Sequence, residues 1–125
     1  DFSIMNNKSD KCDMNENFYA HFSFKNHLEI DKIVIYNGYQ KSKELYKKNN
    51  RAKKIKLYFT KEFSYNFVLK DILEPQEIKL PQSIVSQGVG IEILSVYPGT
   101  KYDDTCISEV ELWNQGEKYE VKNHE

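Results

Sequence analysis

The sequence predicts a single all-β domain, an antiparallel β-sandwich or barrel, from three observations. The chain has 125 residues, which is enough for one domain around one hydrophobic core. Its strongly patterned segments alternate apolar and polar residues with period two, as half-buried strands do. The one segment rich in helix formers, residues 41–54, lacks the apolar stripe that would hold a helix against a core.

Seven short strands are expected, with turn-rich segments between them. The alternating residues that would face the core are, in chain order, Phe18, Ala20, Phe22 and Phe24; Ile33 and Ile35; Ile55, Leu57 and Phe59; Tyr65, Phe67 and Leu69; Ile78 and Leu80; Val89, Ile91 and Ile93; and Val110 and Leu112. Residues 41–54 are expected to form a long loop with one helical turn at 42–46. The polar ends, 1–17 and 114–125, are expected to be loosely held around a sandwich at 18–113.

Composition and charge exclude several classes of protein. No apolar run approaches the roughly 18 residues of a membrane span. The 18 basic and 19 acidic residues give a net charge of −1, which argues against a general attraction to nucleic acid or anionic lipid. His21, His27 and His124 fall on separate segments, so no Ser-His-Asp or Cys-His pairing is visible, and Gly-rich phosphate loops are absent. We therefore expect no enzyme.

Strand parity sorts the connections between strands. If successive strands run antiparallel, the connections fall alternately at the two ends of the domain. One end would collect residues 37–53, 70–76 and 95–105, and the other end residues 25–31, 60–64 and 81–88.

The first end is the candidate site because it gathers aromatic faces and planar polar groups. Carbohydrate recognition needs an aromatic face for the C–H side of a sugar and fixed polar groups for its hydroxyls. The alternative is that these tyrosines pack against or cap the turns beside them. The candidate ligand-binding residues are Tyr39, Tyr46, Asn50, Arg51, Asp71, Tyr97, Tyr102 and Asp104.

A structural Ca²⁺ ion is one candidate cofactor. Asp103, Asp104 and Glu109 would supply carboxylate oxygens, the ligands that Ca²⁺ takes. The alternative is a solvated acidic turn.

The two cysteines, Cys12 and Cys106, form either a disulfide or two free thiols, since no metal-binding spacing surrounds them. Strand parity places both at the same end of the domain. In the chain-entropy model, closing a loop of this length would stabilise the fold by roughly 4 to 5 kcal/mol.

Eight of the 18 basic residues lie within residues 41–56. Such a run would attract an anionic glycan, a phosphate backbone or an acidic protein. The alternative is a loop kept soluble by its lysines.

Two blocks of sequence resemble a known family. In residues 33–59, Asn37-Gly38-Tyr39 follows a strand and precedes Lys-Ser, a tyrosine, Asn49-Asn50-Arg51 and a basic strand; residues 96–113 read VYPGTKYDDTCISEVELW. In this order the blocks resemble the discoidin-like, NADase-type glycan-binding domains, a bacterial family related to the translocation module of a streptococcal NAD glycohydrolase. The resemblance covers residues 19–113. It implies a galactose-binding-like jelly roll that serves as an accessory binding module.

Two main hypotheses about function follow. The first is a non-catalytic glycan-binding module of an exported protein, secreted or in the cell envelope, with the ligand at the rim of residues 37–53 and 95–105. The second is a protein-interaction or translocation adaptor for a neighbouring enzyme or receptor. Nucleic-acid binding through the lysine run is a third and would weaken steeply with salt.

Overall fold

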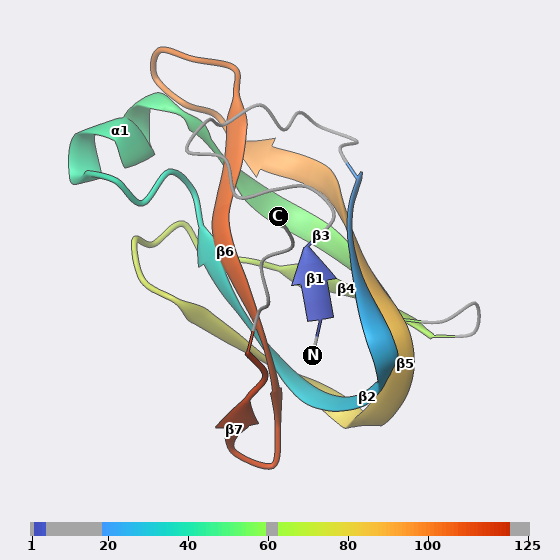
Figure 1. The fold of residues 1–125 in the computed structure, drawn as a ribbon. Helices are drawn as coiled ribbons and strands as arrows, with labels where there is room; N and C mark the ends of the chain where they lie inside the picture. The colour runs from blue at the N-terminus through green and yellow to red at the C-terminus, as the bar shows by residue number, and fades with distance from the viewer. Residues whose placement is uncertain (1, 5–18, 60–62, 121–125) are drawn as a thin grey trace.

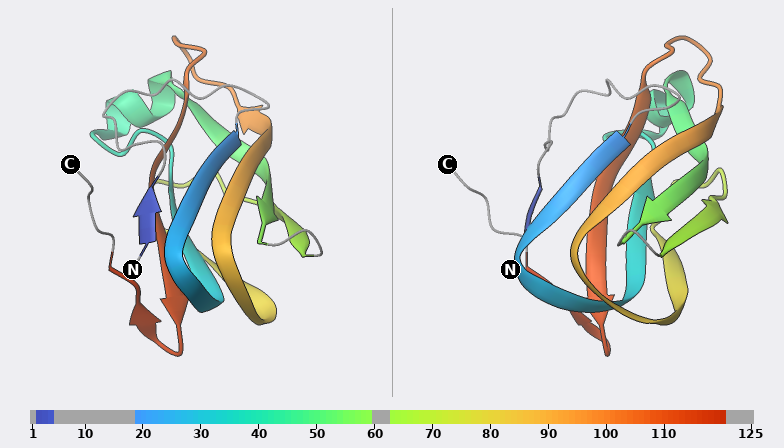
Figure 2. Two further views of the ribbon diagram at one scale, coloured as in Figure 1. Left: turned by 45° about the vertical axis from the view of Figure 1, so that its right-hand side comes forward. Right: turned by 90° about the vertical axis from the view of Figure 1, so that its right-hand side faces the viewer.

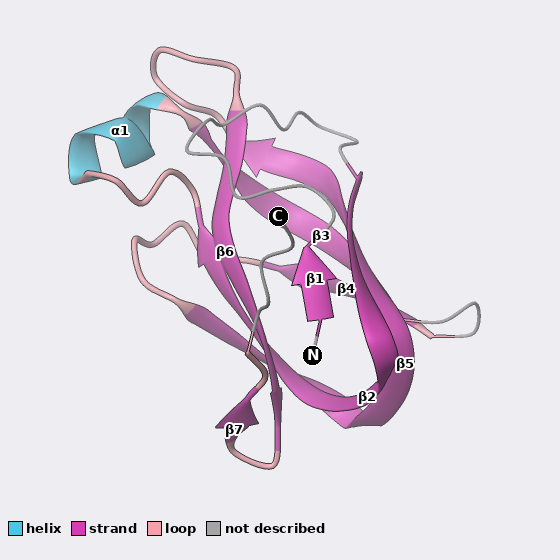
Figure 3. Cartoon of the chain, viewed as in Figure 1, coloured by secondary structure: helices cyan, strands magenta, loops and turns pink. Residues whose placement is uncertain are grey.

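Two long strands that bend from one sheet into the other organise the protein. The computed structural model describes residues 2–4, 19–59 and 63–120, with the backbone alone for 2–4 and 19–22. The described residues form one helix and seven strands, which are drawn in Figures 1 and 3. Their bounds are β1 Phe2–Ile4, β2 Tyr19–Asn37, α1 Lys43–Lys48, β3 Asn50–Tyr58, β4 Ser64–Val68, β5 Gln76–Tyr97, β6 Thr105–Asn114 and β7 Glu117–Lys118.

The antiparallel pairing of β2 with β5 runs from Tyr19↔Glu92 to Ile35↔Gln76. Its register shifts twice, and there both strands bend together at one end of the molecule (Figure 2). Beyond the bend, β2 also pairs with β6, while the second half of β5 pairs with β3, and β3 pairs with β4. A short parallel pairing of β3 with β6 links the two layers. The predicted all-β antiparallel sandwich is confirmed.

The core lies between the two layers and is built from the alternating residues of the strands. Each fully buried aliphatic side chain contributes about 1.5 to 3 kcal/mol of transfer free energy relative to an exposed one. The largest fully buried apolar side chains are Ile30, Ile33, Ile35, Ile55, Leu57, Leu69, Val89, Ile91, Ile93 and Leu112.

The prediction of loops at 25–31 and 81–88 is wrong. Residues 25–31 lie within β2 and 81–88 within β5, so four of the expected strands merge into two. The register jumps from Ile30↔Ile84 to Lys32↔Lys79, which leaves a bulge that contains Pro81. A β-bulge bends a strand without ending it and can contain a proline. Its amino-acid composition therefore resembles that of a turn, which is why the sequence predicts a loop.

The prediction of a long loop at 41–54 is also wrong in its extent. Six residues form α1, and the Ser42 side chain caps it by accepting a hydrogen bond from the Leu45 N–H. Strand β3 already begins at Asn50. The helix is held by one buried residue, Tyr46, rather than by a stripe.

At the C-terminal end, β7 pairs with the end of β6, and the Tyr119 hydroxyl donates to the Glu29 carbonyl at 2.6 Å. Most of the predicted N-terminal segment, residues 1–17, lies outside the described residues. Among the residues that are described, no helix has the length and hydropathy to cross a membrane.

Candidate functional site

The connections at 37–53, 70–76 and 95–105 meet at one end of the sandwich, the end that carries α1 in Figure 1. Arg51 at the start of β3 joins all three. Its guanidinium contacts Asp71 in the second connection and the Pro98 carbonyl in the third. The meeting of three segments distant in sequence follows from the antiparallel order of the strands.

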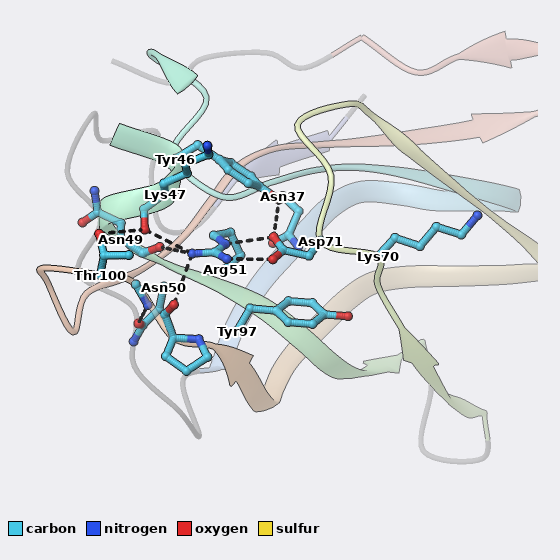
Figure 4. Close-up of polar contacts among 12 residues, drawn as sticks. Asn37, Tyr46, Lys47, Asn49, Asn50, Arg51, Lys70, Asp71, Tyr97 and Thr100 are labelled. Atoms are coloured by element: carbon cyan, nitrogen blue, oxygen red, sulfur yellow. Dashed lines mark hydrogen bonds and ion pairs between the residues drawn. The ribbon is translucent and has the colours of Figure 1, made fainter. Parts of the chain in front are cut away.

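Arg51 is the centre of this end and is only 8% exposed. Its Nε and Nη2 donate to the two carboxylate oxygens of Asp71 at 3.0 and 2.7 Å, a bidentate ion pair. Its Nη1 donates to the carbonyl oxygens of Lys47, Asn49 and Pro98 at 3.1 to 3.3 Å. Figure 4 shows these bonds radiating from one planar group. Arg51 thus ties α1, β3 and two loops together.

Tyr46 of α1 completes this cluster. Its hydroxyl donates to Asp71 Oδ1 at 2.8 Å, and the Arg51 guanidinium lies 5.1 Å from the centroid of its ring. We call Tyr46, Arg51 and Asp71 the Arg51 clasp.

The clasp shifts the pKa values of its members in opposite directions. The hydrogen bond from Arg51 holds the pKa of the Asp71 carboxyl below its ordinary value. Burial, and then the hydrogen bond to the Asp71 carboxylate, raise the pKa of the Tyr46 hydroxyl. Asp71 therefore stays ionised and Tyr46 stays protonated at neutral pH, the states that the hydrogen bonds require.

Gly38 is required by the clasp. Its φ is +81°, and a Cβ atom at this position would lie 2.5 Å from the Tyr46 ring and 2.8 Å from Arg51 Cγ. Gly99 is likewise pressed against the backbone of Lys48 and Asn49. The Asn-Gly and Pro-Gly turns of the sequence are therefore sites of close packing as well as turns.

Two buried asparagines fix the connections. The Asn37 side chain donates to the Ala52 carbonyl at 2.8 Å and accepts from the Ala52 N–H at 3.0 Å, which joins the end of β2 to β3. The Asn50 side chain donates to the Asp103 carbonyl at 2.7 Å and accepts from the Gly99 N–H at 2.6 Å. Asn37 is not among the predicted ligand-binding residues; its signals in the sequence are the Asn-Gly pair and its place in the first block of the family resemblance.

Residues 98–104 are fastened to the end of α1. The N–H groups of Thr100, Lys101 and Tyr102 donate to the carbonyls of Lys47 and Lys48 at 2.8 to 3.2 Å. These are carbonyls of the last helical turn, which have no partner inside a helix. The Tyr102 side chain remains 41% exposed above them. We call the exposed side chains of α1 and of residues 98–104 the loop-end platform.

The predicted ligand-binding residues divide into two groups. Tyr46, Asn50, Arg51 and Asp71 bond one another or the backbone, and the Tyr97 hydroxyl donates to the Leu69 carbonyl at 2.7 Å. These contacts fit the alternative that the polar and aromatic groups hold the loops. The predicted residues that stay more open are Tyr39, which is half-buried, and Tyr102 and Asp104, which are exposed.

The carboxylates proposed for Ca²⁺ do not gather around a common point. Within the described part of the chain, no three His, Cys, Asp or Glu side chains lie together as metal ligands. Glu109 is five residues along the chain from Asp104, and extended β6 starts between them. At about 3.3 Å per residue, an extended strand separates two such positions by far more than the diameter of an ion site.

Cys106 lies at the start of β6, is 3% exposed and is disulfide-bonded. Its predicted partner, Cys12, lies outside the described residues, so this pairing stays a prediction. The lysine run divides between two elements: Lys43, Lys47 and Lys48 lie on α1, and Lys53, Lys54 and Lys56 on β3.

Comparison with known proteins is consistent with this geometry. The profile of the family described as NAD glycohydrolase translocation F5/8 type C domain matches residues 16–113. The NMR structure of the Streptococcus pyogenes NAD+-glycohydrolase translocation domain matches with a TM-score of 0.61 and 26% sequence identity, covering 79% of this chain and 88% of that one. No match was found among curated proteins. The resemblance read from the two sequence blocks is thereby confirmed.

Proposed function

The chain belongs to the NAD glycohydrolase translocation F5/8 type C domain family, and on that premise we propose that it is a non-catalytic translocation adaptor of an exported protein. The S. pyogenes relative is a translocation domain of an NAD+-glycohydrolase. By analogy, this chain docks a protein partner while an enzyme is moved across a membrane.

The observation that carries the proposal is the network of hydrogen bonds that holds the backbone of the loop-end platform. The Asn50 side chain and the last carbonyls of α1 hold residues 98–104 through hydrogen bonds to their backbone, and Arg51 Nη1 donates to the Lys47 carbonyl of α1. A surface that is ordered before binding loses little conformational entropy when a partner docks. Tyrosine is among the residue types that anchor protein interfaces. We therefore place the docking anchor at Tyr102.

The charges on the loop-end platform indicate the kind of partner that would bind it. Lys47 and Lys101 are exposed near Tyr102, with Lys101 Nζ 5.4 Å from the centroid of its ring, whereas Lys48 is paired with Glu44 at 2.9 Å. This platform would fit a partner that has an apolar pocket for the tyrosine, with carboxylates around the pocket.

The adaptor needs no catalytic residue of its own. His27 is the one histidine whose side chain the structure describes, and it is exposed on β2 near the bend. The clasp residues hydrogen-bond one another. Chemistry would then reside in the protein to which the adaptor is joined or docked.

The test is capture and titration. The chain, immobilised, is exposed to secreted and envelope proteins of the source organism, and the captured protein is purified and titrated. The double variant Tyr102→Ala, Lys101→Glu should raise its Kd at least about tenfold, which corresponds to roughly 1.4 kcal/mol. Val85→Ala, an exposed apolar residue at the bend of β5, is the matched control and should leave the Kd unchanged.

Glycan binding is the competing outcome, since Tyr39, Tyr102 and Asp104 remain open to solvent. Release of the captured material by free sugar, with Tyr102→Ala abolishing sugar binding, would replace the adaptor by a glycan-binding module. Equal Kd values for the double variant and the control would contradict the assigned platform.

A further inference from the structure

Strand β4 forms an edge of the sandwich. Its pairing is with β3 alone, in the unbroken register Lys54↔Val68 to Tyr58↔Ser64. Figure 2 shows β4 beside β3 at the margin of the layer that contains the second half of β5. The other side of β4 therefore carries a row of backbone groups without a neighbouring strand in the described part of the chain.

The hydrogen-bond pattern identifies these groups. The N–H of Phe59 donates to the Phe63 carbonyl at 3.0 Å, and that of Leu69 donates to the Lys53 carbonyl at 2.7 Å. Bonded pairs recur at every second residue of an antiparallel ladder, so Tyr65 and Phe67 also direct their backbone groups toward β3. The N–H and C=O groups of Ser64, Asn66 and Val68 consequently point outward.

This edge lacks the usual protection against pairing. Natural edge strands are blunted by charged residues, prolines or bulges. The sequence of β4, Ser-Tyr-Asn-Phe-Val, contains no charge and no proline, and its ladder has no bulge. Val68, near the end of this edge, is 58% exposed.

The charge beside the edge selects the partner. Lys54 and Lys56 lie directly across from Val68 and Asn66 on the same outer face, and exposed Lys70 follows the strand. Valine is short, so the exposed Lys54 chain can extend over Val68 toward the edge. Lys56 is half-buried, with its Nζ 5.1 Å from the centroid of the Tyr58 ring, and adds positive charge to the same face. An added strand would lie about 4.8 Å beyond β4, within the combined reach of a lysine and a glutamate side chain.

We propose that the free edge of β4 binds an extended acidic segment of another polypeptide, which adds to the sheet as a further strand. The outward groups of Asn66 and Val68 supply the backbone hydrogen bonds. Lys54 and Lys56 select segments that carry Asp or Glu at alternate positions. This surface is separate from the loop-end platform, so the inference stands apart from the proposed function.

The test uses two blocked eight-residue peptides, one of alternating Thr and Glu and one of alternating Thr and Lys. Amide hydrogen exchange is followed by NMR. With the acidic peptide at about ten times its Kd, exchange at Asn66 and Val68 should slow about tenfold by mass action. The basic peptide should have no effect, and the inward amides of Tyr65 and Phe67 should not change.

Two sets of variants test the backbone contacts and the charge contacts separately. Asn66→Pro removes one outward donor, which an edge strand tolerates, and should abolish the protection of Val68, whereas Asn66→Ala keeps the donor and should retain it. Lys54→Glu with Lys56→Glu should reverse the preference to the basic peptide even if the proline variant fails to fold. Lys25→Glu with Lys79→Glu, at exposed positions on β2 and β5, is the charge-matched control and should change nothing.

Three results would overturn the proposal. They are protection by neither peptide, equal protection by both, and protection that appears without peptide as the protein concentration rises. The last would assign the edge to a second copy of the chain.

Discussion

Tyr46 and Arg51 bond the same carboxylate oxygen, Oδ1 of Asp71, at 2.8 and 3.0 Å. One residue comes from the helix and the other from the first residues of β3. The shared acceptor keeps the aromatic ring and the guanidinium in contact, which fixes the direction in which the chain leaves α1. The stability of the loop-end platform should therefore depend on Asp71.

Replacing the carboxylate tests this dependence. Asp71→Asn keeps the shape but removes the charge, leaving the buried Arg51 guanidinium without its counter-ion. We expect the free energy of unfolding in urea to fall by about 1 to 3 kcal/mol, below the range for a fully buried pair because Asp71 is partly exposed. Asp104→Asn, at an exposed carboxylate nearby, should change it by less than about 0.5 kcal/mol. Equal losses for the two variants would contradict the role of the clasp.

The same pair predicts a dependence of stability on pH. Arg51 lowers the pKa of Asp71 in the folded state, so the folded protein holds this carboxyl proton less tightly than the unfolded chain does. The resulting stabilisation is complete above the ordinary carboxyl pKa of about 3.9 and is lost as the pH falls through the lowered value. The difference in unfolding free energy between wild type and Asp71→Asn should be constant from pH 7 to about pH 5 and shrink below about pH 4. A difference that grows on acidification would refute this linkage.

Gly38→Ala should be severely destabilising. The substitution combines a positive φ with overlap between the new Cβ and the Tyr46 ring. We expect a loss of about 2 to 4 kcal/mol, measured by thermal unfolding. Gly116→Ala is a matched control, because its φ is +80° but no atom lies within 4 Å of the added Cβ. It should cost about 1 kcal/mol from backbone strain alone. If the two variants lose the same stability, packing against Tyr46 is not what requires the glycine.

Asn50→Ala should loosen residues 98–104 without unfolding the sandwich. The variant removes the bonds to the Gly99 N–H and the Asp103 carbonyl. We expect the Gly99 amide to exchange at least about tenfold faster, as the loss of about 1.4 kcal/mol of local stability predicts. Amides of the buried strands, such as that of Ile91, should serve as the unchanged reference. Unaltered exchange at Gly99 would show that other bonds suffice to hold the loop.

The pairing of Cys12 with Cys106 can be checked chemically. We expect no free thiol in the native protein, and a fall in thermal stability on reduction or in Cys12→Ser. The chain-entropy model gives an upper magnitude of roughly 4 to 5 kcal/mol. Detection of two free thiols in protein kept oxidised would remove the bridge.

Several properties could be predicted from the local pattern. Alternation with period two identified most of the core-facing residues, since a strand directs every second side chain to one side. It missed Leu28, Ile30, Ala52 and Ile84, which lie in segments predicted to be loops. It also predicted that three distant connections meet, because antiparallel order alone decides which connections share an end. The two sequence blocks, in their order, also indicated the family that the profile match over residues 16–113 shows.

The bends of β2 and β5 could not be predicted in this way. Exposed polar residues and a proline occur both in a bent strand and in a loop, so they do not distinguish the two. Whether the chain continues as a strand depends on a partner that bends with it, and that partner is distant in sequence.

The sequence by itself determined the fold class, most of the core-facing residues and which connections share an end, because these follow from period and strand order. The tertiary structure alone decided that Arg51, Asn50 and Tyr46 face inward while Tyr102 faces solvent. The residue types are equally suited to holding a loop and to binding a ligand. The choice between these roles depends on whether their hydrogen bonds are already satisfied, and the partners that satisfy them, Asp71, Pro98 and Asp103, are 20 to 53 residues away along the chain.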